Sequence, residues 1–462
     1  MSNVYICCKI WKIMKICSIH IKGYKQFQDT YIDFTNPETG EPVNKVCFIG
    51  KNGTGKTTIL RIINEFVDCD YFNIDKFFWK NCLNISFLIK IKINDQFLLV
   101  FKNFIFLYNS EIEKCFAEID GTEDSFKEFI SQNKINVAND DIMCKVHDFW
   151  KKKDFLHIYA PSESHQNHLI NIEDVPQSSV NEALQLFHNF PNYHEVSDQN
   201  IQYFWTLLIY LIKKREEEQQ LFENKPENLS KTKRELLAEF EKINPKILDK
   251  IAILWNKILD KAGLEFDVEN ANNPIQLTDN LKAYIRLKGT KENIPYSELS
   301  TGIRNFIFRV GHIFSLYFNK EVKTGFLLID EPENSLFPDF LFELIETYQE
   351  IVNDKNGENN TQIFMTTHNP IIAAQFEPYE RIILDWNENG TVKASKGITP
   401  AGDDPNDILE RDFKLPNLMG KKGMEFWEKY LALKQALRKS TNEDEKMELS
   451  DKITAIGTSY NF

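Results

Sequence analysis

The chain has 462 residues, of which 42% are hydrophobic and 27% are charged, and it contains 36 phenylalanines. This composition is typical of a soluble globular protein and excludes a largely disordered chain. The length favours one large core with an elaborate insertion, because it exceeds a usual single domain yet is small for three. The formal net charge of -13 argues against a surface built wholly to wrap nucleic acid, although a local basic groove is compatible with it.

All eight cysteines lie between Cys7 and Cys144, and no repeated CxxC pair or histidine spacing completes a zinc site. We therefore expect reduced thiols and a cytoplasmic protein. The first residues are apolar and slightly basic, but they lack an uninterrupted apolar stretch and a small-residue cleavage site, which argues against a signal peptide. No segment is predicted to span a membrane. The folded domain is expected to begin near Met14, with residues 1–13 as an extension.

An N-terminal lobe is expected over residues 1–110. Alternating apolar and polar residues predict two strands between Ile16 and Phe34, and residues 46–49 form a short buried strand that enters a glycine-rich turn. Residues 84–108 predict an antiparallel meander, because apolar residues alternate on both sides of an Asn-Asp turn.

An insertion is expected over residues 111–289. The pattern between about 111 and 200 assigns no fold. Helical periodicity returns at Ile201, and four apolar residues share one face of the expected helix: Phe204, Leu207, Leu208 and Leu211. Ser230 is placed to cap a second helix that ends at Gly263 and bends at Pro245. Its apolar positions step by fours and threes from Leu236 through Ile243 to Ile258. Residues 201–263 should therefore form a short helical hairpin.

Regular alternation of helix and strand defines a C-terminal lobe, residues 290–400, followed by a helical tail over residues 401–462. In that tail Asp404 is placed to cap a helix and Pro405 to be its first residue.

Residues Gly50 to Thr57 read GKNGTGKT, a complete GxxxxGKT motif between a buried strand and a helix. Glycines let backbone N–H groups curl around phosphate oxygens, Lys56 can neutralise the β and γ phosphates, and Thr57 can bind magnesium. The residues expected to hold the nucleotide here are Asn52, Gly53, Thr54, Gly55, Lys56, Thr57 and Thr58. The alternative is a glycine-rich turn without a ligand.

The segment GFLLIDEPE, residues 325–333, is an apolar strand that ends in two adjacent acids. Asp330 could hold magnesium directly or through water, and Glu331 could polarise the attacking water as a general base. Taken alone, this pattern also fits a strand that ends in solvated acids.

Two further segments could face a phosphate. Leu299 to Arg304 places Ser300 and Gly302 at the start of a helix, where backbone N–H groups attract anions. The strand QIFMTTHNP ends near His368, whose imidazole could touch a γ-phosphate. Taken alone, the first is a plain helix cap and the second a structural histidine.

The order of these segments resembles the ABC ATPase head: Walker A at 50–57, signature at 299–304, Walker B at 327–331, D-loop at 333–336 and switch His368. The wide gap between Walker A and the signature makes the chain similar to the SMC, RecF and OLD branch. The resemblance implies an α/β fold, a P-loop NTPase with a mixed sheet and an antiparallel β subdomain that carries a helical insertion. It covers about 14–110 and 290–400.

The resemblance also implies cofactors, ATP and Mg2+, and a homodimer in which two heads pair head to tail. Ser300 and Gly302 of one copy would close over the nucleotide held by Lys56 of the other, and assemblies larger than a dimer are compatible with this arrangement. Asn334 and Ser335 would communicate across the interface. Gln166 would be the Q-loop magnesium ligand.

The signature departs from the family's LSGGQ at Thr301 and Ile303, which puts the glutamine-specific contacts in doubt. The residues expected to carry hydrolysis are Glu331, His368 and Lys56.

Within that branch, the chain looks similar to stand-alone ATPases of bacterial anti-phage systems such as Septu, PARIS and retrons. This resemblance implies an ATP-dependent sensor or scaffold that controls a separate nuclease or toxin. OLD proteins carry a Toprim nuclease after the head, but the residues after His368 contain no strand ending in DxD. We read Asp403, Asp404 and Asp407 as cap and turn residues.

The alternative is a DNA-repair ATPase of the RecF kind, with DNA as its partner. A transporter subunit is disfavoured, because the insertion leaves no simple coupling surface for a membrane partner.

Overall fold

The computed structural model describes residues 13–68, 86–101, 104–118, 123–132, 155–162, 192–197, 201–268, 285–294, 298–320, 324–353 and 360–460. Contacts divide the chain into two compact units, Met1–Gly402 and Asp403–Phe462, which are described separately below.

A seven-stranded sheet forms the centre of the first unit, in the order β15-β14-β3-β13-β12-β7-β8. Every pair of neighbours is parallel except β14 and β15, which are antiparallel. The strands are β3 (Lys45–Gly50), β7 (Leu156–Ala160), β8 (Tyr193–Glu195), β12 (Thr324–Asp330), β13 (Asn360–Thr366), β14 (Arg381–Trp386) and β15 (Val392–Lys396). Because β3, β13 and β12 are adjacent and parallel, their carboxyl ends lie side by side at one edge.

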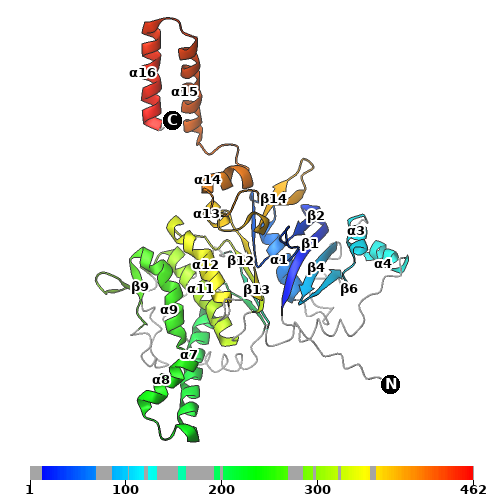
Figure 1. The fold of residues 1–462 in the computed structure, drawn as a ribbon, viewed down its shortest axis with the longest axis vertical. Helices are drawn as coiled ribbons and strands as arrows, with labels where there is room; N and C mark the ends of the chain where they lie inside the picture. The colour runs from blue at the N-terminus through cyan, green and yellow to red at the C-terminus, as the bar shows by residue number, and fades with distance from the viewer. Residues whose placement is uncertain are drawn as a thin grey trace. The chain divides into compact units, whose positions relative to one another are not determined.

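The helices near this sheet can be followed in Figure 1. They are α1 (Lys56–Asp68), α11 (Thr301–Lys320), α12 (Leu341–Val352) and α13 (Pro370–Ala373). α1 packs against β12 and β13, whereas α11 packs against β7 and α12. The first turn of α1 therefore begins directly above the strand ends.

A second, antiparallel sheet has the order β2-β1-β4-β5-β6. Its strands are β1 (Met14–Tyr24), β2 (Phe27–Asp33), β4 (Ser86–Ile93), β5 (Gln96–Phe101) and β6 (Phe104–Leu107), and two helices follow, α3 (Ser110–Glu118) and α4 (Glu123–Gln132). The meander turns at Asn94, whose φ of 51° is the left-handed value that such turns require. The early strands and the meander are confirmed.

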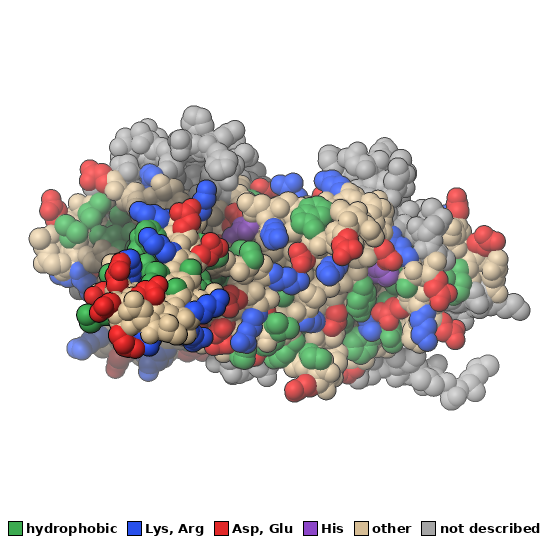
Figure 2. All heavy atoms as spheres, turned by 90° about the horizontal axis from the view of Figure 1, so that it is seen from above, with side chains coloured by type: hydrophobic (Ala, Val, Ile, Leu, Met, Phe, Trp, Pro, Cys, Tyr) green, Lys and Arg blue, Asp and Glu red, His purple; other side chains and the backbone are tan. Residues whose placement is uncertain are grey.

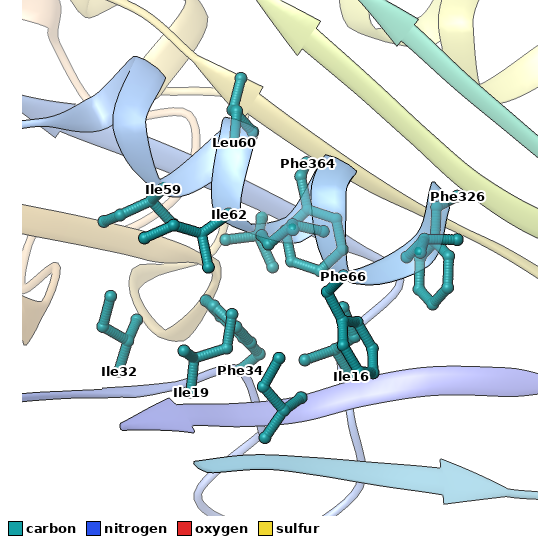
Figure 3. Close-up of a cluster of buried hydrophobic side chains, with 14 of the residues drawn as sticks. Ile16, Ile19, Ile32, Phe34, Ile59, Leu60, Ile62, Phe66, Phe326 and Phe364 are labelled. Carbon is teal, nitrogen blue, oxygen red and sulfur yellow. The ribbon is translucent and has the colours of Figure 1, made fainter. Parts of the chain in front are cut away.

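One continuous apolar core joins the two sheets through α1 (Figure 3). Ile16 and Ile19 of β1, Ile59 and Phe66 of α1, and Phe364 of β13 belong to it. Burial of such side chains is the main favourable term that holds the P-loop helix between the sheets.

A buried glutamine ties the sheets together at a bulge. The pairing of β1 with β4 shifts register between Ile16 and Ser18, and next to this shift the N–H and C=O of Ile16 both bond to a side chain. Gln362 satisfies both: its Oε1 accepts from Ile16 N at 2.8 Å, and its Nε2 donates to Ile16 O and Val43 O at 3.0 Å.

The region expected as an insertion contains helices that pack on the head. They are α7 (Ile201–Glu223), α8 (Lys233–Ile243) and α9 (Ile247–Leu259), followed by a small sheet of β9 (Leu264–Phe266), β10 (Ile285–Leu287) and β11 (Asn293–Ile294). α7 and α9 both pack against α11. The four α7 positions expected to share an apolar face, Phe204 to Leu211, are buried.

Two details of this hairpin differ from expectation. The cap of α8 is Thr232, not Ser230, because Thr232 forms a reciprocal capping box with Glu235 that Ser230 is too early to make. Ile243 is exposed and not on the apolar face, since α8 ends there and Pro245 separates it from α9.

The second unit holds α14 (Pro405–Asp407), α15 (Lys421–Lys439) and α16 (Glu443–Tyr460). The Asp404 side chain accepts from Asn406 N, which confirms the cap, and Pro405 is the first helical residue. α15 and α16 pack on each other as a hairpin, with Phe426 stacked on Tyr460 at 4.2 Å between ring centroids.

Among the described residues, the cysteines Cys17, Cys47 and Cys115 are free and buried. None of the helices in the described part of the chain has the length and apolarity needed to cross a bilayer.

Candidate functional site

The P-loop follows β3 and turns directly into α1. Lys56 begins the helix, and its ammonium folds back over the loop to donate to Gly50 O at 2.9 Å and Lys51 O at 3.3 Å. Burial lowers the pKa of Lys56, while Glu331 and Asp330 act in the opposite direction. A phosphate in the loop could replace those carbonyls as the partner of the ammonium.

Two P-loop glycines have no room for a side chain. At Gly55 the φ is +95°, and a Cβ would lie 2.3 Å from Gln26 Nε2 and 2.5 Å from Phe27 Cζ. At Gly50 a Cβ would lie 2.3 Å from Leu384 O. Asn52 and Gly53 are exposed at the tip, Thr54 is buried, and Thr57 and Thr58 are half-buried in the first turn of α1. The sequence therefore specifies an open anion cradle with tightly packed flanks.

Asp330 ends β12 beneath this cradle and is almost fully buried. Its Oδ1 accepts from Thr57 at 3.1 Å and from Thr366, the last residue of β13, at 2.5 Å. Within the described part of the chain, its Oδ2 is buried without a hydrogen-bond partner. A carboxylate oxygen left free beside a threonine hydroxyl fits a hard divalent cation, which commonly binds nucleotide phosphates through one or two protein oxygens.

Glu331 and His368 face each other at the ends of β12 and β13. His368 Nε2 lies 3.3 Å from Glu331 Oε1, and Asn334 Nδ2 donates to Glu331 Oε2 at 3.2 Å. Burial and the nearby Lys56 ammonium lower the pKa of His368, so that the neutral imidazole is favoured. The backbone of Glu331 is in the left-handed region, with φ 45°, and such strain is common at functional sites.

Glu333 lies behind this pair. Its Oε1 accepts from Thr367 Oγ1 at 2.6 Å and from His368 N at 2.8 Å. Burial raises the pKa of Glu333, and hydrogen bonds from Thr367, from His368 N and from its own backbone act against that shift.

The signature segment lies at the start of α11. Ser300 is exposed, and its hydroxyl is 3.4 Å from Ile303 N, as in a helix cap. Gly302 is buried against the turn after β12, where a Cβ would lie 1.9 Å from Ser335 O. The segment is thus linked to Glu331 through that turn, while Ser300 itself remains free to contact another molecule.

Sequence reasoning missed two polar residues that organise the site, Thr366 and Arg309, and it gave no role to Glu333, the first residue of the expected D-loop. Arg309, buried in α11, donates to Pro161 O at 2.7 Å and fixes the loop after β7. The paired threonines before His368 and the third acid of DEPE were the available signals for Thr366 and Glu333. Gln166, the expected Q-loop residue, lies outside the described residues.

Comparison with known proteins identifies the family. The model of the AAA ATPase domain family matches residues 14–373, most of the chain. The SMC head domain from Thermotoga maritima is 13% identical with a TM-score of 0.40, and the match covers 83% of this chain and 100% of that one. The recombination mediator protein RecF, solved with ATPrS, is 12% identical with a TM-score of 0.32, covering 83% and 99%. No curated protein matched.

The P-loop, the acids at the end of β12 and the family match agree on one chemistry: the chain belongs to the AAA ATPase domain family and is an ATP-hydrolysing enzyme.

Proposed function

We propose that this protein is an ABC-type ATPase of the SMC and RecF kind that binds MgATP on the P-loop. Backbone N–H groups between Asn52 and Thr58 would hold the phosphates, and Lys56 would turn from the loop carbonyls to the β and γ oxygens. Thr57 and the free Oδ2 of Asp330 would hold Mg2+, which neutralises developing charge on the phosphates. The observation that carries this proposal is the contact between Thr57 and Asp330 at 3.1 Å, because it joins the two motifs.

Glu331 would orient and polarise the attacking water, and His368 would bind the γ-phosphate. Their mutual distance of 3.3 Å supports roles on the same group. A neutral imidazole can donate one N–H to phosphate while Glu331 stays an acceptor for water.

A second copy of the chain would complete the site. Ser300 is exposed at the amino end of a helix, Thr301–Lys320, whose aligned N–H groups favour an anion. Ser300 and Gly302 of one protomer would close over the ATP of its partner, so that hydrolysis is tied to dimer state.

We further propose that the ATP-dependent dimer acts as a sensor or scaffold in anti-phage defence and controls a separate nuclease or toxin in the cytoplasm. This role is what the resemblance to stand-alone ATPases of anti-phage systems implies, and it rests on the compact head, the short helical hairpin and the helical tail. The order of motifs favours equally the alternative of a RecF-like ATPase that binds DNA across the dimer. In Figure 2, acidic and basic side chains are interspersed over the face seen from above.

Nucleotide affinity tests the site. Lys56→Ala should abolish binding of a fluorescent ATP analogue, whereas Lys51→Ala, on the exposed part of the same loop, should bind it like the wild type. Wild-type affinity in Lys56→Ala would refute the proposed site.

Two measurements separate the biological roles. Purification from native cells under ATP should retain a nuclease or toxin if the protein is a sensor or scaffold. DNA binding that strengthens with ATP and weakens steeply with salt would instead support the repair role.

A further inference from the structure

Glu333 belongs to none of the roles given above, yet its carboxyl group is buried between the two strand ends that carry Glu331 and His368. One oxygen, Oε1, receives two hydrogen bonds, from the Thr367 hydroxyl at 2.6 Å and from His368 N at 2.8 Å. The other, Oε2, is buried without a hydrogen-bond partner among the described residues. Burying a carboxyl oxygen without a hydrogen-bond partner lowers the stability of the fold, so this residue calls for an explanation beyond packing.

These two hydrogen bonds join the turn after β12 to the residues that directly follow β13. Glu333 follows β12 by three residues, whereas Thr367 and His368 follow β13 directly. The hydrogen bond to His368 is made by its backbone N–H, so it fixes where the residue stands without using the imidazole. Nearby, Glu331 N donates to Thr366 Oγ1 at 3.1 Å, which ties the same two strand ends from the other direction.

The turn that carries Glu333 is also strained. Glu331 and Ser335 have φ values of 45° and 64°, in the left-handed region that residues with a Cβ rarely adopt. Such a conformation persists only where surrounding contacts determine it. The hydrogen bond that Glu331 N donates to Thr366, and those that Thr367 and His368 N donate to Glu333, are contacts of that kind.

We propose that Glu333 is a positioning residue for ATP hydrolysis: it clamps the end of β13 to the turn after β12 and thereby sets the imidazole of His368 against the Glu331 carboxylate. This inference rests on the proposed roles of Glu331 and His368. Glu333 itself touches no phosphate and acts only through its neighbours. Because an acceptor oxygen is all that the two donors need, glutamine should replace glutamate here, whereas alanine should not.

The test measures kcat, KM and nucleotide affinity in the full-length protein for Glu333→Ala and Glu333→Gln. Loss of the clamp should lower kcat about 10- to 100-fold while nucleotide affinity changes by less than about threefold, since a misplaced group affects the transition state more than binding. Glu333→Gln should recover kcat to within about threefold of wild type. Glu346→Ala, on the exposed face of α12, is the matched control and should behave as wild type.

A double-mutant comparison distinguishes positioning from general destabilisation. If Glu333 acts through His368, adding Glu333→Ala to His368→Ala should cost little more kcat. Thr367→Val, which removes one donor and keeps the side-chain shape, should reproduce part of the loss, and thermal unfolding will show which variants are folded.

Three outcomes would overturn the inference: an unchanged kcat in folded Glu333→Ala, an equal loss in Glu333→Gln, or full additivity with His368→Ala. Failure of the proposed function looks different, because Glu331→Gln and His368→Ala would then turn over ATP at the wild-type rate by themselves.

Discussion

The strand-end cluster and the signature segment are the two regions that we propose to bind phosphate, and they differ in how complete they are. The cluster lies at the carboxyl ends of three adjacent parallel strands, β3, β13 and β12, and is joined by contacts within one chain. Its residues are Lys56 and Thr57 of α1, Asp330 and Glu331 at the end of β12, and His368 after β13. In the signature segment, Ser300 is exposed, and its hydroxyl accepts a hydrogen bond from Ile303 N of its own helix.

The difference teaches what a single chain can supply. It provides the cradle, a free carboxylate oxygen for a metal and an acid beside a histidine. The signature is fixed by Gly302 against the turn after β12, and its exposed Ser300 is the residue that we propose to contact a second copy. Each prediction below challenges one side of this contrast.

The largest effect is expected at Glu331. Glu331→Gln removes the base but keeps the volume, so kcat should fall at least ~100-fold, the usual contribution of a general base, while ATP binding persists. Steady-state turnover and binding of a fluorescent ATP analogue measure the two quantities. Glu343→Gln, in the following helix and paired with Lys261, serves as the control. Near wild-type turnover by Glu331→Gln would show that Glu331 takes no part in hydrolysis.

Ser300→Arg tests the other side of the contrast. If Ser300 meets the partner's nucleotide, kcat should fall by about 10-fold or more with unchanged affinity for the nucleotide bound by the same chain. Thr232→Ala, which removes the cap of α8, should cost about 1 kcal/mol of stability and leave turnover intact. If the two variants behave alike, Ser300 is only a cap.

A smaller effect, on stability, is expected at the joint between the two regions. Gly302→Ala places a Cβ 1.9 Å from Ser335 O and should lower the free energy of unfolding by about 1–3 kcal/mol. Gly289→Ala, where a Cβ meets nothing within 4 Å, should change it little. Equal unfolding curves in urea for both variants would show that the signature is not held against that turn.

The remaining effect, also on stability, depends on pH and concerns His312, in the middle of α11. Burial lowers its pKa to about 3, and neither ring nitrogen has a hydrogen-bond partner in the described part of the chain. Below pH about 6.5 the unfolded chain binds a proton that the folded chain does not, so stability falls as pH falls toward 3.

His312→Leu removes the group that binds this proton in the unfolded chain. Between pH about 6.5 and 4.5 it should reduce the loss of stability by about 2 kcal/mol, measured by chemical denaturation at each pH. His157, whose pKa burial also lowers to about 3, keeps the remaining slope in both proteins. An unchanged slope would mean that His312 is protonated in the folded state.

The fold was predictable where local pattern and tertiary packing agree. The meander up to Asn94 alternates except at Leu88, because Phe87, Ile89, Ile91 and Ile93 all belong to the main apolar core, and the P-loop glycines Gly50 and Gly55 have backbone angles that favour glycine. Asp330 and Glu331 were found because two acids ended a buried strand beside a complete P-loop motif.

The remainder was not accessible from local pattern. β7, with residues Leu156–Ala160, is buried on both faces beside β12 and shows no alternation that marks a strand. Thr366 and Glu333 acquire their roles only when β12 and β13 become neighbours, a contact between distant parts of the sequence. Thr232 outcompetes Ser230 because the side chain three residues later decides the cap.

The central claim is that ATP joins two copies, so that the signature of one completes the cluster of the other. Light scattering on Glu331→Gln, with and without ATP and magnesium, tests it most directly. We predict that ATP doubles the mass of the particle, from one copy to two. Adding Ser300→Arg should abolish this increase while ATP remains bound. An ATP-bound Glu331→Gln protein that keeps its nucleotide-free mass would contradict the account.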